Sequence, residues 1–416
     1  MLAHQLQFSP DQGDAFFDEL PASPAVFLLR GGTLAALQGD ADSEQRSALA
    51  AEGQPYVSKT ANLRRRLRRL LGPPTEQSKR LNLRDRVREV EFTATGSDFE
   101  SQFVLYRVLR ETFPKTYAAR LRLRPAPLVK LHLENEYPRA SVTTRLGKLR
   151  EARSDERDAN KPNRYYGPFR SRTAAEKFAN DALDLFKMRR CVDDLHPDPA
   201  FPGCVYSEMK MCLAPCFKGC TDDEYRHEVD RVQAFFDTSG ESLVRELTQQ
   251  REQASADLAF EEAAATHAKL EKLKPVLSQL PEIVHRIDQL RAVIIQKGAE
   301  PGAVVLFQFA DAAFAAPLTF NVELKAESRS LESQIEELLG RFPAPQPATA
   351  TERMEHLAIL KRWYYRSTRA GEIFFADENG NWPLRRIVRG IGRVRAGEKE
   401  LAAITFSATE DPSLPS

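Results

Sequence analysis

The five cysteines of this chain constrain its fold most, because they lie together in one short stretch. All five fall between Cys191 and Cys220 of the 416 residues, and nearly 200 residues on either side contain none. Where thiols stay reduced, such a cluster predicts a metal site rather than disulfides. Twelve residues separate Cys191 from Cys204, seven separate Cys204 from Cys212, and three separate Cys212 from Cys216 and Cys216 from Cys220. This is not the paired C-x-x-C of a zinc ribbon, so the spacing leaves zinc and an iron–sulfur cluster open.

Composition excludes several classes of protein. The chain is 42% hydrophobic and 29% charged, which is ordinary for a soluble globular protein, and 416 residues suffice for two or three domains. Its formal net charge of +1 gives no indication of a nucleic-acid partner. No apolar run approaches the roughly 18 residues of a membrane span, and residues 1–10 lack the parts of a secretory signal. We therefore expect a cytoplasmic protein with no membrane partner.

Hydrophobic periodicity and breaker residues divide the chain into four segments. The first has the short apolar runs and helical leucine spacing of a small mixed α/β domain. Its predicted strands are 24–29, 55–58 and 88–93, and its predicted helices are 63–71, ended by Gly72-Pro73-Pro74, and 99–113, capped by Ser97 or Asp98.

The later segments differ in pattern. The second holds a strand at 128–133, a polar loop at 150–163, a helix at 173–188 and the cysteines. From Asp222 to Lys297 the pattern is almost wholly helical, and Glu300-Pro301-Gly302 marks its border. A small α/β-like region follows, with a Pro/Ala/Thr-rich linker. The predicted domains are 15–125, 126–235, 236–298 and 301–400, and that linker is 343–351.

One predicted helix carries an unusual charge. Between Lys59 and Arg88 there are eleven basic and two acidic residues in a chain that is otherwise balanced. A basic stripe of this kind suits the phosphate backbone of DNA, although a solvated helix face has the same pattern. The candidate DNA-binding residues, behind the leucine stripe, are Arg64, Arg65, Arg68 and Arg69.

Two N-terminal motifs resemble the GIY-YIG nuclease domain of the UvrC family. The family has P-G-V-Y and then Y-V-G-K-A-x-N-L-R-x-R; this chain has P-A-V-F at 24–27 and Y-V-S-K-T-A-N-L-R-R-R at 56–66, and 127–143 is also similar. Phosphodiester hydrolysis needs a base, a cation by the phosphate and a divalent metal held by a carboxylate. The resemblance implies that Tyr56 serves at the nucleophile, with Lys59 and Arg66 beside the phosphate, and Mg²⁺ or Mn²⁺ if the site is active.

The chain departs from the family at the metal ligand. The family's glutamate position falls on Leu105, which cannot bind Mg²⁺, and the asparagine of the following turn falls on Tyr117. The first motif also has Phe27 in place of tyrosine. The domain is therefore expected to be a non-catalytic DNA-binding relic, unless a shift of register brings Glu100 to the metal.

The surroundings of the cysteines resemble the UvrC cysteine-rich region. The matching stretches are Y-G-P-F at 166–169, L-F-K-M-R-R-C at 185–191 and C-L-A-P-C at 212–216. The resemblance implies a [4Fe-4S] cluster, with zinc as the alternative, acting as a staple for the loop. Cys220 is left over as an incidental thiol or a substitute ligand. The implied ligands are Cys191, Cys204, Cys212 and Cys216.

The helical segment contains a stretch, 258–270, similar to the family's UVR motif, L-x-F-E-x-A-A-x-x-R-D-x-I. The resemblance implies docking to a matching motif of UvrB through one helical face. The arginine–aspartate pair of the motif is absent, and an internal helical hairpin without a partner is the alternative. The implied partner-binding residues are Phe260, Ala263, Ala264 and Leu270.

We see neither the RNase H-like nuclease nor the helix-hairpin-helix modules with which UvrC proteins continue, so a second incision is not expected. Arginines mixed with aromatics at 361–366 and 382–389 suit nucleic acid or ordinary packing. The predicted fold class is α/β plus α: a GIY-YIG-like domain, a cysteine-rich metal-binding region, a helical UVR segment and a small α/β-like domain. The predicted function is a UvrC-like excision-repair protein that binds DNA and UvrB with an impaired nuclease site. The alternatives are an active single-incision endonuclease and a DNA-binding regulatory module without catalysis.

Overall fold

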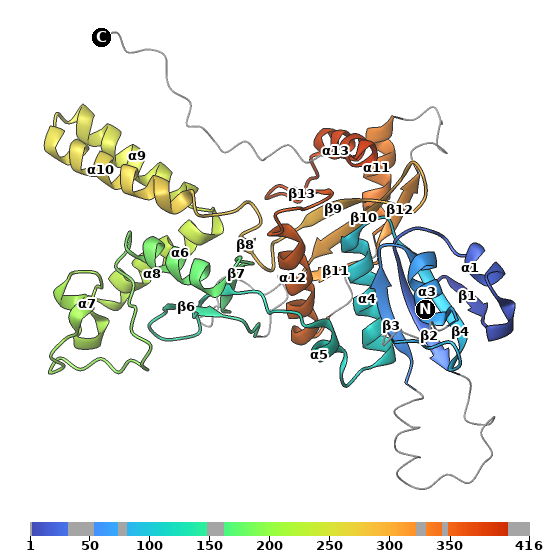
Figure 1. Cartoon of the computed structure of the whole chain (residues 1–416). Coiled ribbons are helices and arrows are strands. Elements are labelled where there is room, and N and C mark those ends of the chain that lie inside the picture. Colours follow the sequence, from blue (N-terminus) through green and yellow to red (C-terminus); the bar gives the residue numbers. More distant parts are fainter. Residues whose placement is uncertain are drawn as a thin grey trace, which may run out of the picture.

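The computed structural model describes residues 2–31, 54–73, 81–147, 162–321, 330–342 and 348–397. In these residues the strands form three antiparallel sheets, two of four strands and one of five. The N-terminal and C-terminal sheets lie beside each other, while the third sheet and a helical hairpin occupy the other half of the molecule (Figure 1). This confirms the mixed α/β class. No helix in the described ranges is long and apolar enough to cross a membrane.

The N-terminal sheet has strand order β1-β4-β2-β3. Central β2 pairs with both neighbours, so that Phe27 lies opposite Ser58 of β3 and Phe92 of β4. β1 adds an outer strand ahead of residue 15, where the sequence pattern placed the start of the domain. The strands are β1 His4–Gln7, β2 Ala25–Gly31, β3 Tyr56–Thr60 and β4 Val87–Ala94.

Different helices cover the two faces of this sheet. Helix α3 (Leu63–Leu71) packs its leucines with α1 (Ala15–Asp18) on the face that carries Phe27 and Leu29. It begins where the Asn62 side chain accepts a hydrogen bond from the Arg65 amide at 2.9 Å, and it ends at Gly72 as predicted. Helix α4 (Asp98–Thr112) covers the opposite face, over β2 and β3, and is followed by the short helix α5 (Tyr117–Leu121).

The C-terminal sheet is buried on both faces. Val293 and Ile295 of β9 point toward α11 and α13, while Ile294 between them points into the core that includes α12. Figure 1 shows these helices on opposite sides of the sheet. The strands are β9 Ala292–Lys297, β10 Ala303–Ala310, β11 Ala313–Phe314, β12 Leu318–Asn321 and β13 Glu372–Phe375, and the helices are α11 Leu331–Gly340, α12 Ala350–Tyr364 and α13 Leu384–Ala396.

Helix α4 joins the two sheets into one body. The ring of Phe99 lies 4.9 Å, and that of Phe103 5.6 Å, from the ring of Phe307 on β10. The same helix packs on β3 of the N-terminal sheet. Helix α4 therefore links the C-terminal core to one face of the N-terminal sheet, at Val57 of β3, while the other face of that sheet has its own apolar core with α3.

The third sheet supports the cysteines. Its strand order is β6-β5-β7-β8, and aromatic residues of α6 (Arg172–Leu183) and α8 (Asp222–Asp237) pack against it. Residues 188–221, which we call the cysteine-rich lobe, connect these helices through α7 (Val205–Glu208) and the 3-10 turn Pro215–Phe217. The strands are β5 Leu128–Leu131, β6 Ala140–Thr143, β7 Arg164–Gly167 and β8 His285–Arg286.

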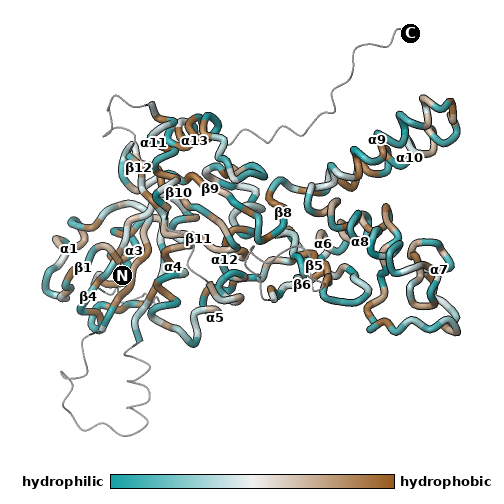
Figure 2. The backbone as a smooth tube through the Cα atoms, turned by 180° about the vertical axis from the view of Figure 1, so that it is seen from behind, coloured by the Kyte–Doolittle hydropathy of each residue, from teal (hydrophilic) through white to brown (hydrophobic). Residues whose placement is uncertain are grey.

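Helices α9 (Glu241–Ala256) and α10 (Phe260–Leu277) form an antiparallel hairpin. The hairpin projects from the body in two opposite views (Figures 1 and 2). Leu258 stands at its tip in a left-handed conformation, with φ of 59°. Its inner residues, such as Leu247 and Leu273, are buried between the two helices.

Two secondary-structure predictions are wrong. The helical pattern expected to run to Lys297 ends at Leu277, and β9 instead pairs with β10 across the predicted border near residue 300. The run Ala292–Lys297 is apolar on both faces, so its periodicity did not distinguish a doubly buried strand from a helix. The helix expected over 173–188 ends at Leu183, because the chain turns there into the cysteine-rich lobe. Most of the loop at 150–163, and half of the linker at 343–351, lie outside the described residues.

Candidate functional site

Two of the three predicted catalytic side chains meet. Arg66 donates a hydrogen bond from Nη2 to the hydroxyl of Tyr56 at 3.0 Å. Tyr56 begins β3 and Arg66 lies in the first turns of α3, so the tight strand–helix connection brings them together. The ring of Phe27 lies 6.1 Å from that of Tyr56 and adds no second hydroxyl. The pair could hold an anionic oxygen next to a cation.

Lys59 does not join them. Side chains alternate along a strand, so Lys59 points toward α4 while Tyr56 points toward α3. Its Nζ lies 2.5 Å from Oδ1 of Asp98, in the first turn of α4. Arg366, just after α12, binds the other oxygen of the same carboxylate. The predicted trio is therefore split between two faces of the edge strand.

Asp98 was not predicted as a site residue, since Ser97-Asp98 has the pattern of a helix cap. Ser97 is indeed the cap: its hydroxyl accepts a hydrogen bond from the Glu100 amide at 3.1 Å. Partial burial raises the pKa of Asp98, but the hydrogen bonds and charges of Lys59 and Arg366 outweigh it and hold that pKa below its ordinary value. Asp98 is thus an ionised carboxylate beside a predicted catalytic lysine.

Neither carboxylate position considered from the sequence is available to a metal. Leu105 is half-buried and packs against the apolar core together with Val57. Glu100 turns back along its own helix, where Oε2 accepts a hydrogen bond from the Gly96 amide at 2.7 Å. Burial raises the pKa of Glu100, which the Gly96 hydrogen bond only partly offsets.

The four predicted DNA-binding arginines of α3 divide into two pairs. Arg64 donates to the carbonyl oxygens of Leu20 and Asp18 at 2.8 and 3.0 Å. Arg68 lies 3.2 Å from the Asp18 carboxylate. Arg65 and Arg69 are exposed and have no hydrogen-bond or ion-pair partner in the described part of the chain. Arg68 is exposed as well, but only Arg65 and Arg69 are both exposed and unpaired among the described residues, one helical turn apart.

The cysteine-rich lobe brings its sulfurs toward one another. Besides burial, the negative charge of Cys191, Cys216 and Cys204 raises the pKa of Cys212, which reaches about 11. Burial raises the pKa of Cys220, helped by the charges of Glu224 and Asp222 and, among the cysteines, of Cys216 alone. The Ala214 amide donates to the sulfur of Cys212 at 3.3 Å. Among the described residues no three His, Cys, Asp or Glu side chains stand at metal-binding geometry.

A buried arginine faces this group of thiols. The side chain of Arg189 is 2% exposed, and its Nη1 lies 3.4 Å from the sulfur of Cys191. Its other hydrogen bonds go to the carbonyl oxygens of Tyr137 and Asp193, at 3.0 and 2.9 Å. Within the described ranges no carboxylate pairs with it. A buried guanidinium is costly without a counter-charge, so the site favours an anionic thiolate centre.

The predicted partner-binding residues lie on two sides of α10. The Phe260 side chain is 66% exposed at the hairpin tip, and Ala264 is exposed one turn later. Ala263 and Leu270 are half-buried, on the side that faces α9. The hairpin itself is present, and its tip combines Phe260 with Leu258, which is 71% exposed.

A polar cluster that sequence reasoning missed joins α4 and α5 to α12. The hydroxyls of Tyr106 and Tyr117 donate to the two oxygens of Glu355, at 2.9 and 2.7 Å. Arg110 forms a paired contact with Glu352 one turn earlier on α12. These partners lie more than 230 residues apart, so no local motif signals them. Tyr117, at the position of the family's asparagine, therefore serves this joint.

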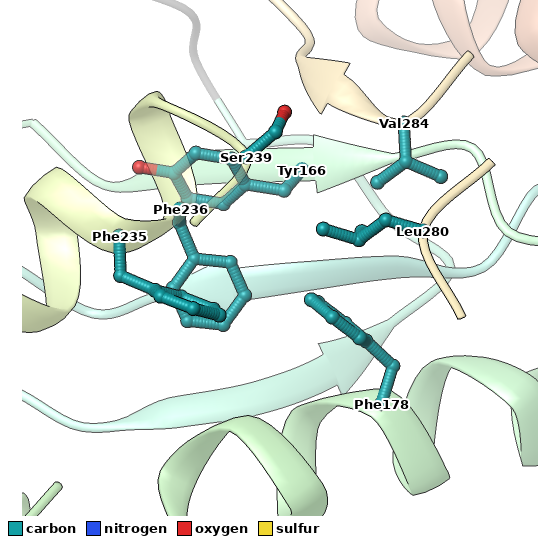
Figure 3. Close-up of a pocket in the computed structure, with 7 residues that line it drawn as sticks. All are labelled: Tyr166, Phe178, Phe235, Phe236, Ser239, Leu280 and Val284. Atoms are coloured by element: carbon teal, nitrogen blue, oxygen red, sulfur yellow. The ribbon is translucent and has the colours of Figure 1, made fainter. Parts of the chain in front are cut away.

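Two small hollows are not candidate catalytic sites. One lies in the core under the third sheet, and Figure 3 shows it lined by aromatic and aliphatic side chains, with Tyr166 and Ser239 as its polar residues. The hydroxyl of Tyr166 donates to Asp237 at 2.8 Å. The other lies between α4 and α12 beside Asp98 and Arg366, at the ion pairs described above.

Comparisons with known proteins agree on one family. Residues 130–235 match the family model of the UvrC/Cho excinuclease middle domain. The UvrABC system protein C of Idiomarina loihiensis is 30% identical over 223 residues, which is 53% of this chain and 34% of that protein. These matches place residues 130–235 in the UvrC/Cho middle-domain family. The protein of the same name from Methanothermobacter thermautotrophicus is 26% identical over 62% of this chain and 41% of its own length, and that from Desulforudis audaxviator is 25% identical over 70% and 42%.

The match to the UvrC family has limits. The chain spans between 34% and 42% of the length of these three relatives. No solved structure matches. The family model runs from within β5, through β6, β7 and α6, to near the end of α8, and it includes the whole cysteine-rich lobe with its five cysteines. The UvrC middle domain is therefore where the family relationship and the candidate metal ligands coincide.

Proposed function

We propose that this chain is a DNA-binding protein of nucleotide excision repair whose N-terminal nuclease-like site does not cut. The observation that carries the proposal is the loss of both candidate metal carboxylates: position 105 is a leucine in apolar packing, and Glu100 is bound to the backbone of Gly96. The Tyr56–Arg66 pair remains. A pair of this kind can bind a phosphate oxygen but cannot by itself hold the divalent ion that hydrolysis needs.

The same site supports a second candidate, a nuclease that cuts one strand once. Asp98, at the start of α4, is ionised and lies beside Lys59. Lys59 is on β3, the edge strand that also carries Tyr56. It would supply the metal carboxylate only after releasing Lys59 or Arg366, which now neutralise it. That requirement makes binding without cutting the better-supported function.

Purified protein is expected to bind plasmid DNA and leave it uncut in Mg²⁺ or Mn²⁺, with or without UvrB. The measurement is conversion of supercoiled to open-circular UV-damaged plasmid, beside a Tyr56→Phe/Arg66→Ala variant and an Asp98→Asn variant. Nicking seen equally with all three proteins would come from a contaminating nuclease. Nicking that both variants lose would establish the single-cut nuclease and reject our proposal.

For the cysteine-rich lobe we propose a [4Fe-4S] cluster held by Cys191, Cys204, Cys212 and Cys216, with zinc as the alternative. Either centre with four thiolates carries net negative charge and would neutralise the buried Arg189 guanidinium. Amide and guanidinium N–H groups already point at the sulfurs of Cys212 and Cys191. When bound, the metal would staple the lobe between α6 and α8.

We further propose that the α9–α10 hairpin docks UvrB through its tip. Exposed large apolar side chains at Leu258 and Phe260 are typical of a docking surface. Phe260→Ala is expected to weaken binding of UvrB by about 10- to 30-fold, the effect of removing one central aromatic contact. Phe201→Ala is the matched control, since Phe201 is 44% exposed on the cysteine-rich lobe. Titration calorimetry measures both; equal affinities for all three proteins would reject the docking site.

A further inference from the structure

Helix α13 carries a concentration of charge that the proposed function does not use. Its 13 residues include five arginines and no acidic residue. Its inner side buries Ile387, Ile391 and Val394 against the C-terminal sheet. The arginines therefore gather on the outer side, where the helix lies at the surface of the molecule (Figure 1).

Four of the five arginines form one exposed surface, which we call the α13 arginine face. At about 100° per residue, Arg385 and Arg389 lie in its central row, and Arg386 and Arg395 flank that row on either side. Gly392 continues the central row and is also exposed. Arg393 is excluded, because its guanidinium forms two hydrogen bonds of 2.6 Å with Glu372.

Internal contacts account for little of this charge. Arg386 lies over the ring of Phe374 at 6.0 Å, and Arg385 lies 3.8 Å from Glu332 of the neighbouring helix. Within the described residues Arg389 and Arg395 have no hydrogen-bond or ion-pair partner. Arg385 and Arg389 also repel each other at i,i+4, and Arg385 and Arg386 stand at the positive end of the helix dipole. These repulsions lower the stability of the helix, and an anion bound from outside would offset them.

The backbone of α13 also permits close approach. Gly390, on the inner side, lets the helix lie on β13: a Cβ there would stand 2.5 Å from the Phe374 ring. Gly392, on the outer side, would meet nothing within 4 Å. A rigid ligand could therefore reach the helix backbone between the flanking arginines.

We propose that the α13 arginine face binds the phosphate backbone of duplex DNA; this inference rests on the proposed function and adds a second DNA contact to it. The face is roughly 15 Å long, enough to span several phosphates of a duplex. Single-strand binding would need aromatic side chains for base stacking, and α13 has none. The arginines match phosphate oxygens through paired N–H donors.

A charge series at Gly392 tests the proposal without disturbing the arginines. Gly392→Ala controls for the change of backbone. Relative to it, Gly392→Glu is expected to weaken binding of a duplex oligonucleotide by about 5- to 10-fold, and Gly392→Lys to tighten it and steepen the salt dependence by about one unit of slope. Fluorescence anisotropy measures each at several salt concentrations. Gln249→Glu and Gln249→Lys make the same charge changes on exposed α9 as matched controls.

A further variant separates this inference from the proposed function. Arg65→Ala/Arg69→Ala removes the exposed pair on α3, and it is expected to weaken DNA binding where Arg68→Ala does not. If the Arg65→Ala/Arg69→Ala variant binds DNA more weakly while the Gly392 variants change DNA binding no more than the Gln249 variants do, the α13 inference is wrong and the proposed function stands. Tighter binding of single strands than of duplex would also overturn the inference. If the wild-type chain binds no DNA, the proposed function itself fails.

Discussion

Cys212→Ser is expected to release the metal of the cysteine-rich lobe and to unfold that lobe locally. Cys212 lies within electrostatic reach of the three other proposed ligands. Burial and the neighbouring thiolates raise its pKa to about 11, so a bound metal must displace its proton. Loss of one of four ligands is expected to reduce metal retention to below about a tenth. Anaerobic purification, iron, sulfide and zinc analysis and visible absorbance measure it.

The fifth cysteine supplies the matched control. Cys220 is half-buried like the others, but its thiol interacts with Glu224, Asp222 and Cys216 rather than with the whole group. Cys220→Ser is expected to keep the metal. Loss of metal from this variant and retention in Cys212→Ser would show that Cys220 is a ligand, and no metal in wild-type protein would leave the cysteines unligated.

The Arg189→Met substitution is expected to give opposite results for the two possible states of the lobe, with neutral thiols or with a bound metal. If the thiols are neutral, removing an unpaired buried cation is expected to stabilise the fold. If they hold an anionic metal centre, the same change removes its counter-charge and is expected to weaken metal retention by about 10- to 100-fold. We expect the second outcome, read from metal content and thermal unfolding of the same sample.

Local patterns predicted the elements that position the site. The leucine spacing, the Asn62 cap and Gly72 identify α3 within a residue, and the alternation at 88–93 identifies β4. These features are encoded by neighbours in sequence. The end of α10 was missed because β9 is buried on both faces, which removes the period of two from its pattern.

The candidate site was only partly predictable for a related reason. Tyr56 and Arg66 lie ten residues apart, and their motif implied their contact. Asp98 meets Arg366 just after α12, and Tyr106 and Tyr117 meet Glu355 on α12, in each case across more than 230 residues of sequence. Such pairs exist because α4 is buried between two sheets, and only the tertiary packing reveals them. Arg189 likewise lies in a predicted motif, but its burial depends on Tyr137, which lies between β5 and β6.

Acid is expected to destabilise the protein through His356, which lies in the joint between α4 and α12. The side chain is 5% exposed, and its Nδ1 accepts a hydrogen bond from the Phe314 amide at 3.0 Å. Burial lowers the pKa of His356 to about 4, with Glu352 raising it and Arg110 lowering it by smaller amounts. Below pH 6.5 the unfolded chain therefore binds a proton that the folded chain refuses.

The sign and size of the effect follow from that difference. The contribution of His356 to stability is complete above pH 6.5, is lost as the pH falls toward 4, and amounts to about 3 kcal/mol. His356→Gln is expected to remove this part of the acid sensitivity, since glutamine keeps an acceptor but takes up no proton. The free energy of urea unfolding at pH 7.5 and pH 4.5 measures it, with exposed His227→Gln as the control.

Comparison between variants isolates His356 from other acid-sensitive groups. Burial also lowers the pKa of His132, to about 4, and that of His285, so the wild-type chain is expected to lose more stability than His356 alone explains. The same acid sensitivity in His356→Gln as in wild type would show that the joint between α4 and α12 tolerates a charge. A smaller loss in the variant would show that this joint, which holds the N-terminal sheet to the C-terminal sheet, depends on a neutral imidazole.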